Sequence, residues 1–218
     1  MEDEMDDALS SKSDFNTADP LPLDTNGDSV LVISTHGCET SRRYLASSKV
    51  LSLASPVFKK MFATGFREGD QIQQEKHPSI HLEEDDPKAM ETILRLLHYQ
   101  SADSLFTMKP RALAMLSIQC DKYDLNSALR PWIAQWFSNR IDLPEIEDYG
   151  FLLLAAYMFQ TPAISDVADR AVTELPPDFM STWDKYPELS LLPESMTGLV
   201  PSAVRNPSMK ANRRSEIV

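Results

Sequence analysis

The sequence predicts an α+β fold, with a small sheet near the start of the chain and a run of helices after it. The order of the expected elements is two strands, a pair of helices, a third strand and then helices only. Strands that cluster early, with helices after them, are typical of α+β domains, whereas α/β sheets need strands and helices in alternation. We therefore expect about three strands flanked by a helical cluster, with additional C-terminal helices.

Composition is typical of a globular protein in a reducing compartment. Of the 218 residues, 42% are hydrophobic and 25% are charged, which is enough for the core of one or two domains. The longest apolar run, 151–159, is too short to span a bilayer, and no secretory signal is expected. Two cysteines, Cys38 and Cys120, do not make a disulfide framework. We expect a cytoplasmic or nuclear protein without membrane contact.

The net charge of −12 is concentrated at the N-terminus. Residues 1–28 hold nine carboxylates against one lysine, with few aromatic side chains to offset the entropy lost on ordering. Residues 1–27 are therefore expected to be a disordered acidic tail. Prolines and serines interrupt the pattern late in the chain, which predicts a mostly disordered tail over 186–218. The globular part lacks the basic stripe that nucleic-acid binding needs.

Three segments have the pattern of a strand. The β-branched run 29–34 is expected to be a buried strand, and order is expected to begin just before it, at Asp28. The segment 39–46 is expected to return as the second strand of a hairpin. Residues 79–82 alternate between polar and apolar side chains, which predicts a third strand. The polar segment 65–78 is expected to be a loop.

Helices are predicted where a capping side chain and a proline precede apolar residues at helical spacing. Ser55-Pro56 and Asp86-Pro87 combine an N-cap residue with proline at the first helical position. Pro110, Pro144 and Thr161-Pro162 are expected to begin later helices. The apolar residues that mark the helical faces include Val50, Leu51, Leu53, Val57, Phe58, Met61, Phe62, Met90, Ile93, Leu94, Leu97, Leu113, Leu116, Trp132, Ile133, Trp136, Phe137, Leu153, Tyr157 and Val167.

These elements, in this order, resemble the BTB/POZ domain family. The family has a strand that begins Asp-x-x-Leu, a leucine-rich turn, Ser-Pro-x-Phe with a second Phe four residues on, and an Ile-x-Leu strand before a helix that ends in an aromatic residue. The matching residues in this chain are Asp28, Leu51, Ser55, Pro56, Phe58, Phe62 and Tyr99. The resemblance covers roughly 28–140. It implies the BTB/POZ fold and a non-enzymatic role in binding other proteins.

The chain departs from the family pattern at two positions. Ser47 replaces a histidine that the family usually has four residues before Leu51, so a charged pocket at Asp28 would have to use another partner, such as Lys49. Gln100 replaces the glycine that the family usually has just after the helix-ending aromatic residue.

The helices over 141–185 form an expected C-terminal extension, and they resemble those of fungal stand-alone BTB proteins.

The residues with catalytic or metal-binding potential do not form a recognised motif. The six glycines form no phosphate-binding loop or nucleophile elbow. His77 and His81 lie four apart but on an expected strand, where they would be separated by about 13 Å. The neighbours His36 and Cys38 are expected in a turn, and the acidic run 83–86 is expected to start a helix. Neither a cofactor nor a metal is therefore expected. A pocket that contains two of His36, His77, His81, His98 and Cys38 would favour an enzyme instead.

The resemblance also implies protein partners. In BTB adaptors of cullin-RING ubiquitin ligases, a hydrophobic-x-Glu motif after the second Phe touches the cullin, and the corresponding residues here are Phe66-Arg67-Glu68. Family members commonly form homodimers. A possible cullin contact through Phe66 and Glu68 and a homodimer are therefore expected. Packing of Phe66 against Met61 and Phe62 is one alternative.

A second alternative concerns function. The acidic N-terminus and the basic residues within 205–214 would suit a transcription-linked or signalling scaffold that binds no cullin. The aromatic residues Trp132, Trp136 and Phe137 could form a docking groove, although core packing is the preferred interpretation.

Overall fold

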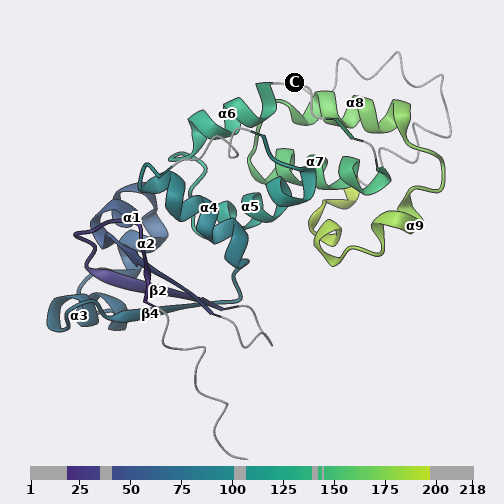
Figure 1. Cartoon of the computed structure of the whole chain (residues 1–218). Coiled ribbons are helices and arrows are strands. Elements are labelled where there is room, and N and C mark those ends of the chain that lie inside the picture. The colour runs from purple at the N-terminus through teal and green to yellow at the C-terminus, as the bar shows by residue number, and fades with distance from the viewer. Residues whose placement is uncertain (1–18, 35–40, 101–106, 139–141, 144, 197–218) are drawn as a thin grey trace, which may run out of the picture. The chain divides into compact units, whose positions relative to one another are not determined.

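The computed structural model describes residues 19–34, 41–100, 107–138, 142–143 and 145–196. The chain separates into two compact units, Met1–Gln100 and Ser101–Val218. In its described part, the first unit combines a small sheet with helices, whereas the second contains helices only (Figure 1). The expected α+β class is confirmed.

The first unit contains a mixed sheet of four strands in the order β1-β3-β2-β4. Strand β2 pairs antiparallel with β3 and parallel with β4, and β1 pairs parallel with β3. The strands are β1 (Leu21–Pro22), β2 (Ser29–Ser34), β3 (Arg42–Ala46) and β4 (Ser79–Glu83). The central strand β2 is buried over nearly its whole length, whereas β4 alternates between exposed and buried residues, as the two sequence patterns predicted.

Strand β1 corrects two expectations about the start of the chain. It adds a fourth strand to the three expected, and it lies inside the segment expected to be disordered through residue 27. Leu23 is buried, and its N–H donates to Leu45 O at 2.9 Å. Burial of this side chain and pairing with β3 hold a segment whose own composition favours disorder. Residues 1–18 lie outside the described residues.

Helices α1 (Ser48–Ala54) and α2 (Pro56–Met61) begin at side-chain caps. Ser47 Oγ accepts from Val50 N–H at 3.4 Å, and Ser55 Oγ accepts from Phe58 N–H at 3.0 Å. Each bond satisfies one of the N–H groups that the first helical turn leaves unpaired. The predicted start of α2 at Ser55-Pro56 is confirmed. Both helices lie to one side of the sheet (Figure 1).

Helix α3 (Arg67–Gln74) replaces the loop expected over 65–78. Its polar sequence has no broad apolar stripe, and a glycine stands inside it, so its propensity pattern does not distinguish it from a loop. Glu68 and Asp70 in its first turn interact favourably with the helix dipole. Further stabilisation comes from contacts with the residues before it, which no local pattern can reveal.

Helix α4 (Pro87–Leu97) closes the core of the first unit. It begins as predicted, with Asp86 Oδ1 accepting from Ala89 N–H at 2.7 Å and Pro87 at the first helical position. It contacts both β2 and α1. The fully buried core side chains of this unit include Leu31, Ile33, Leu51, Phe58, Met90, Ile93 and Leu94.

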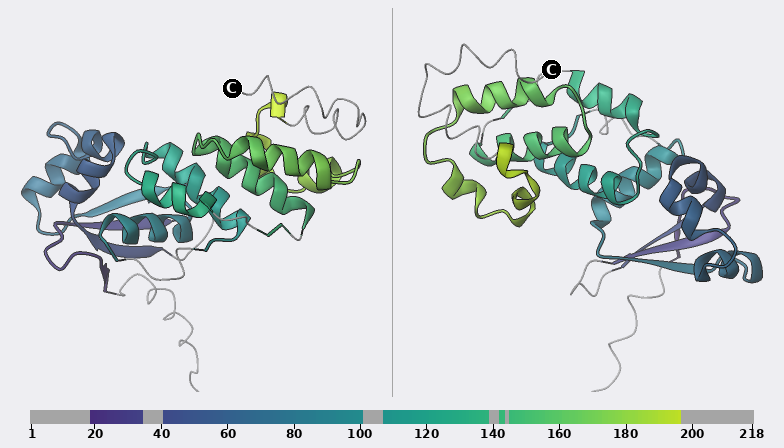
Figure 2. Two further views of the ribbon diagram at one scale, coloured as in Figure 1. Left: turned by 90° about the horizontal axis from the view of Figure 1, so that it is seen from above. Right: turned by 180° about the vertical axis from the view of Figure 1, so that it is seen from behind.

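The second unit is organised around α7. This helix contacts α5, α8, α9 and the short 3₁₀ helix η3, and Figures 1 and 2 show it between α5 and α8. The elements are α5 (Pro110–Lys122), α6 (Arg130–Ser138), α7 (Ile146–Met158), α8 (Ile164–Glu174), α9 (Met180–Trp183) and η3 (Pro187–Leu191). All the residues from Tyr149 to Ala156 are buried. A helix that is apolar on every side belongs in a core.

The C-terminal segment of the second unit extends beyond the expected boundary at residue 185. Leu189 and Leu192 are buried, and the Trp183 indole N–H donates to Ile146 O at 3.0 Å. The tail expected over 186–218 therefore does not begin before residue 192, and residues 197–218 lie outside the described residues. The helices at Pro144 and Thr161-Pro162 start slightly later than predicted, at Ile146 and Ile164.

Candidate functional site

The segment between α2 and α3 exposes an aromatic side chain. Phe66 is 43% exposed and is the N-cap residue of α3. Phe62 instead stacks on Phe58, with ring centroids 5.6 Å apart. Somewhat less than half of the Phe66 surface therefore remains accessible to a partner, whereas Phe58 is fully buried.

Glu68 lies two residues later, in the first turn of α3. Phe66 is still in extended conformation, with φ −103° and ψ 147°, so the polypeptide changes direction between the two residues. The motif therefore spans a helix start, whereas the sequence predicted a loop. An exposed aromatic ring followed by a carboxylate can provide an apolar anchor and a charge-assisted hydrogen bond.

The signature residues of the first unit lie mostly in or beside the core. Leu51 and Phe58 are fully buried, Ser55 caps α2, and Pro56 occupies its first position. Tyr99 is different, because it is 95% exposed at a positive φ of 57° just after α4. Positive φ is unusual for a bulky residue.

Asp28 uses Ser48 as its hydrogen-bond partner at the start of α1. Its carboxylate accepts from Ser48 N–H at 2.7 Å and from Ser48 Oγ–H at 2.6 Å. The Ser47 N–H, at the position where the family usually has histidine, donates to His98 Nε2 at 3.1 Å. This acceptor role fits a neutral ring whose Nδ1–H donates to Leu94 O, 2.8 Å away.

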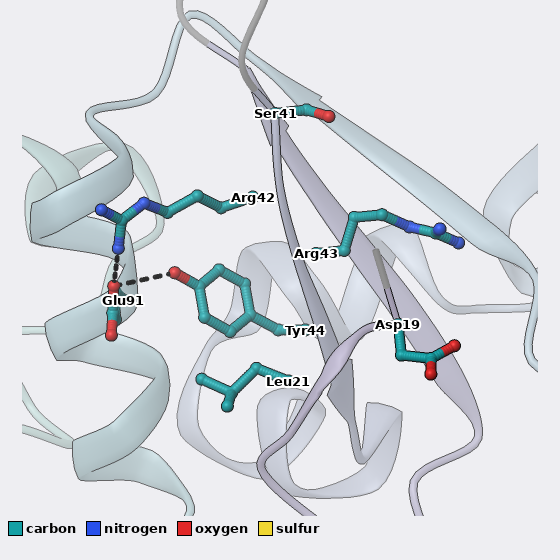
Figure 3. Close-up of a pocket in the computed structure, with 7 residues that line it drawn as sticks. All are labelled: Asp19, Leu21, Ser41, Arg42, Arg43, Tyr44 and Glu91. Atoms are coloured by element: carbon teal, nitrogen blue, oxygen red, sulfur yellow. Dashed lines mark hydrogen bonds and ion pairs between the residues drawn. The ribbon is translucent and has the colours of Figure 1, made fainter. Parts of the chain in front are cut away.

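The first unit also has an open pocket of about 290 Å³ beside β1 and β3 (Figure 3). Its lining residues are Asp19, Leu21, Ser41, Arg42, Arg43, Tyr44 and Glu91. Arg42 and Tyr44 reach toward Glu91 on α4, whereas Arg43 projects to the other side of the strand (Figure 3). The lining contains no histidine or cysteine, so this pocket does not meet the criterion that would favour an enzyme.

Glu91 is the shared acceptor of this pocket. Its carboxylate accepts from the Tyr44 hydroxyl at 3.0 Å and from Arg95 Nε at 3.0 Å, and it pairs with Arg42. Burial opposes ionisation of Glu91, but the hydrogen bonds from Arg95 and Tyr44 and the charge of Arg42 outweigh it and lower its pKa. Burial raises the pKa of Tyr44 to about 12. The cluster joins β3 to α4 and provides no acid–base pair poised near neutral pH.

The remaining residues with chemical potential are separated or have structural roles. His77 lies in the turn before β4 and His81 within it, and the described residues contain no group of three metal-binding side chains. Asp86 caps α4, as the helix-start interpretation predicted. Burial raises the pKa of the Cys120 thiol. His36 and Cys38 lie outside the described residues.

The aromatic residues of α6 pack within the second unit. Trp136 and Phe159 are buried, with ring centroids 6.0 Å apart, and Phe137 meets Phe159 edge-on at 6.4 Å. The core interpretation therefore holds for Trp136, whereas Trp132 and Phe137 are half-buried. Among the described residues, no helix has the length and apolar content needed to cross a bilayer.

Comparison with known proteins agrees with the family that the sequence resembles. No curated protein matches the chain. The family model of the BTB/POZ domain matches residues 26–131, a stretch that holds all the signature residues together with Phe66 and Glu68. Domains of this family mediate interactions between proteins. The chain therefore contains a BTB/POZ domain over residues 26–131.

Proposed function

We propose that this protein recruits a cullin-type ubiquitin-ligase scaffold through Phe66-Arg67-Glu68 and that it acts as a self-associating adaptor. The observation that carries the proposal is the exposed Phe66 ring at the start of α3, with Glu68 in the turn that follows. Aromatic side chains that enter a partner's pocket contribute much of the affinity of an interface. The Glu68 carboxylate would accept a charge-assisted hydrogen bond at the rim of that pocket.

The test is a titration of the full chain with a cullin N-terminal domain, by calorimetry, for wild type and a Phe66→Ala/Glu68→Ala variant. We expect saturable binding by wild type and a loss of at least about 30-fold in the variant, because hot-spot truncation costs ~2 kcal/mol or more. Tyr157→Ala is the matched control, since Tyr157 is an aromatic residue of similar exposure, 38%, on α7. Absence of wild-type binding, or equal losses in the two variants, would contradict cullin recruitment through this motif.

Self-association is supported by a second exposed apolar side chain in the first unit. Leu53 on α1 is 85% exposed, although it lies beside the buried Leu51. An exposed leucine on a short helix would be covered in a dimer. We expect a dimeric mass by light scattering and a monomeric mass for Leu53→Glu, with unchanged circular dichroism. A monomeric wild type at micromolar concentration would contradict this part of the proposal. A dimer that binds no cullin would instead fit a transcription-linked or signalling scaffold.

A further inference from the structure

The residues before Phe66 lie directly on the first turn of α3. A Cβ atom at Gly69 would come within 2.2 Å of Ala63 O and 2.7 Å of Phe62 O. Real Cβ atoms do not approach backbone oxygen atoms so closely, so any side chain at this position would push the loop off the helix. Gly69, the one residue of α3 that is buried, is therefore the contact point between the helix and the loop 63–66.

Two side chains further along α3 also hold this loop. Asp70 Oδ1 accepts from the Gly65 N–H at 3.1 Å, and Gln73 Nε2 donates to Thr64 Oγ1 at 2.9 Å. Within the loop, the Phe66 N–H donates to Ala63 O at 3.2 Å. Each residue from Ala63 to Phe66 thus has a hydrogen bond to α3 or to another loop residue, or directly contacts Gly69.

Gly65 allows the loop to make this turn. Its φ of +92° lies in the left-handed region that side chains disfavour, and a Cβ there would meet nothing within 4 Å. The requirement at Gly65 is therefore one of backbone conformation, whereas the requirement at Gly69 is one of space. Together they place Phe66 at a fixed point relative to the helix that carries Glu68.

We propose that Gly69, Asp70 and Gln73 act as a clamp that positions Phe66 for its partner; this inference rests on the cullin contact proposed above. The clamp residues are positioning residues, because they act through the loop rather than by touching the partner. A loop that is already held in its bound conformation loses less entropy on association, and the gain appears as affinity. The sequence motif alone gives no reason for residues beyond Glu68 to matter.

The experiment compares Asp70→Ala/Gln73→Ala with wild type in the full chain. Amide hydrogen exchange in the free protein reports on the clamp, and we expect exchange of the Gly65 amide to become at least tenfold faster. Affinity for the cullin N-terminal domain should fall about three- to tenfold, less than for Phe66→Ala/Glu68→Ala, because the anchor itself remains. Gln74→Ala, on an exposed position of the same helix, is the control and should change neither quantity.

The variant Asp70→Asn tests whether Asp70 acts through its hydrogen bond to the loop or through its negative charge. Asparagine keeps an oxygen that can accept from the Gly65 N–H but removes the negative charge. We expect it to retain most of the protection of Gly65 and most of the affinity. A loss of affinity in Asp70→Asn equal to that of Asp70→Ala/Gln73→Ala, with Gly65 still protected, would overturn the positioning role in favour of direct contact with the partner.

Two further outcomes distinguish this inference from the proposed function. Wild-type binding that Asp70→Ala/Gln73→Ala retains in full overturns the clamp alone. Failure of wild type to bind the cullin domain overturns the proposed function and, with it, the role of the clamp in binding. Unchanged exchange of the Gly65 amide in Asp70→Ala/Gln73→Ala would show that these side chains do not hold the loop, and it would overturn the clamp itself.

Discussion

Helices α3 and α7 use opposite means to stay folded. Every residue of α7 from Tyr149 to Ala156 is buried, and elements on several sides contact it. In α3 only Gly69 is buried, and the helix depends on a few polar contacts with the loop before it. One helix is a core element, and the other presents side chains to solvent. A buried helix contributes stability through its own side chains, whereas an exposed helix can keep side chains available for a partner.

The largest test of this comparison replaces one phenylalanine in each region. Phe151 on α7 is 1% exposed and meets the Tyr186 ring at 5.2 Å. We expect Phe151→Ala to lower the free energy of unfolding by about 3–5 kcal/mol, through lost burial and a residual cavity. Phe66→Ala should change it by about 0.5 kcal/mol or less, as at other exposed sites.

The measurement is urea unfolding followed by circular dichroism, with tryptophan fluorescence as a reporter of the second unit. The three tryptophans all lie in that unit, at positions 132, 136 and 183. A cost for Phe66→Ala comparable to that of Phe151→Ala would mean that Phe66 belongs to a core, and the comparison between α3 and α7 would then fail.

A smaller effect is expected at the cap of α3. Helix α2 has Ser55 as a side-chain cap, whereas the N-cap of α3 is Phe66, which makes no side-chain cap bond. Asparagine at this position could accept from the Gly69 N–H and stabilise the helix start by about 0.5–1 kcal/mol. We therefore expect Phe66→Asn to slow amide exchange at Gly69 while it weakens cullin binding as much as Phe66→Ala does. Faster exchange at Gly69 would show that the Phe66 ring itself stabilises α3.

The smallest effect is expected at Glu91, whose side chain is 22% exposed. The pKa of Glu91 is lower in the folded protein than its ordinary value of 4.5. The ionised side chain therefore stabilises the fold at pH values above 4.5, and this stabilisation is lost as the pH falls through the folded-state pKa. Glu91→Gln should therefore destabilise the protein near neutral pH but not at pH values below the folded-state pKa. Urea midpoints of both proteins across the acid range measure this convergence. A constant difference at all pH values would contradict an electrostatic role for Glu91.

The candidate site was only partly predictable. The family resemblance pointed to Phe66 and Glu68 as candidate contact residues, but it gave no information about their surroundings. The interval 65–78 was expected to be a loop, because its polar residues and internal glycine have weak helical propensity. The contact of Gly69 with Ala63 O could not be inferred, since the role of a glycine depends on how closely another backbone approaches it. Tyr99 was predicted as a signature position, yet its near-complete exposure had no signal in the sequence.

The sequence by itself determined the features that depend on neighbouring residues. Ser55-Pro56 and Asp86-Pro87 start helices because the capping bond and the proline φ are local, and β2 is buried because its run of apolar residues has no polar face. Tertiary structure alone decided that Leu21–Pro22 is a strand and that 67–74 is a helix. Both segments have weak intrinsic preferences. The conformation of the first depends on a contact with Leu45, far along the chain, and that of the second depends on the close approach of the preceding loop to Gly69.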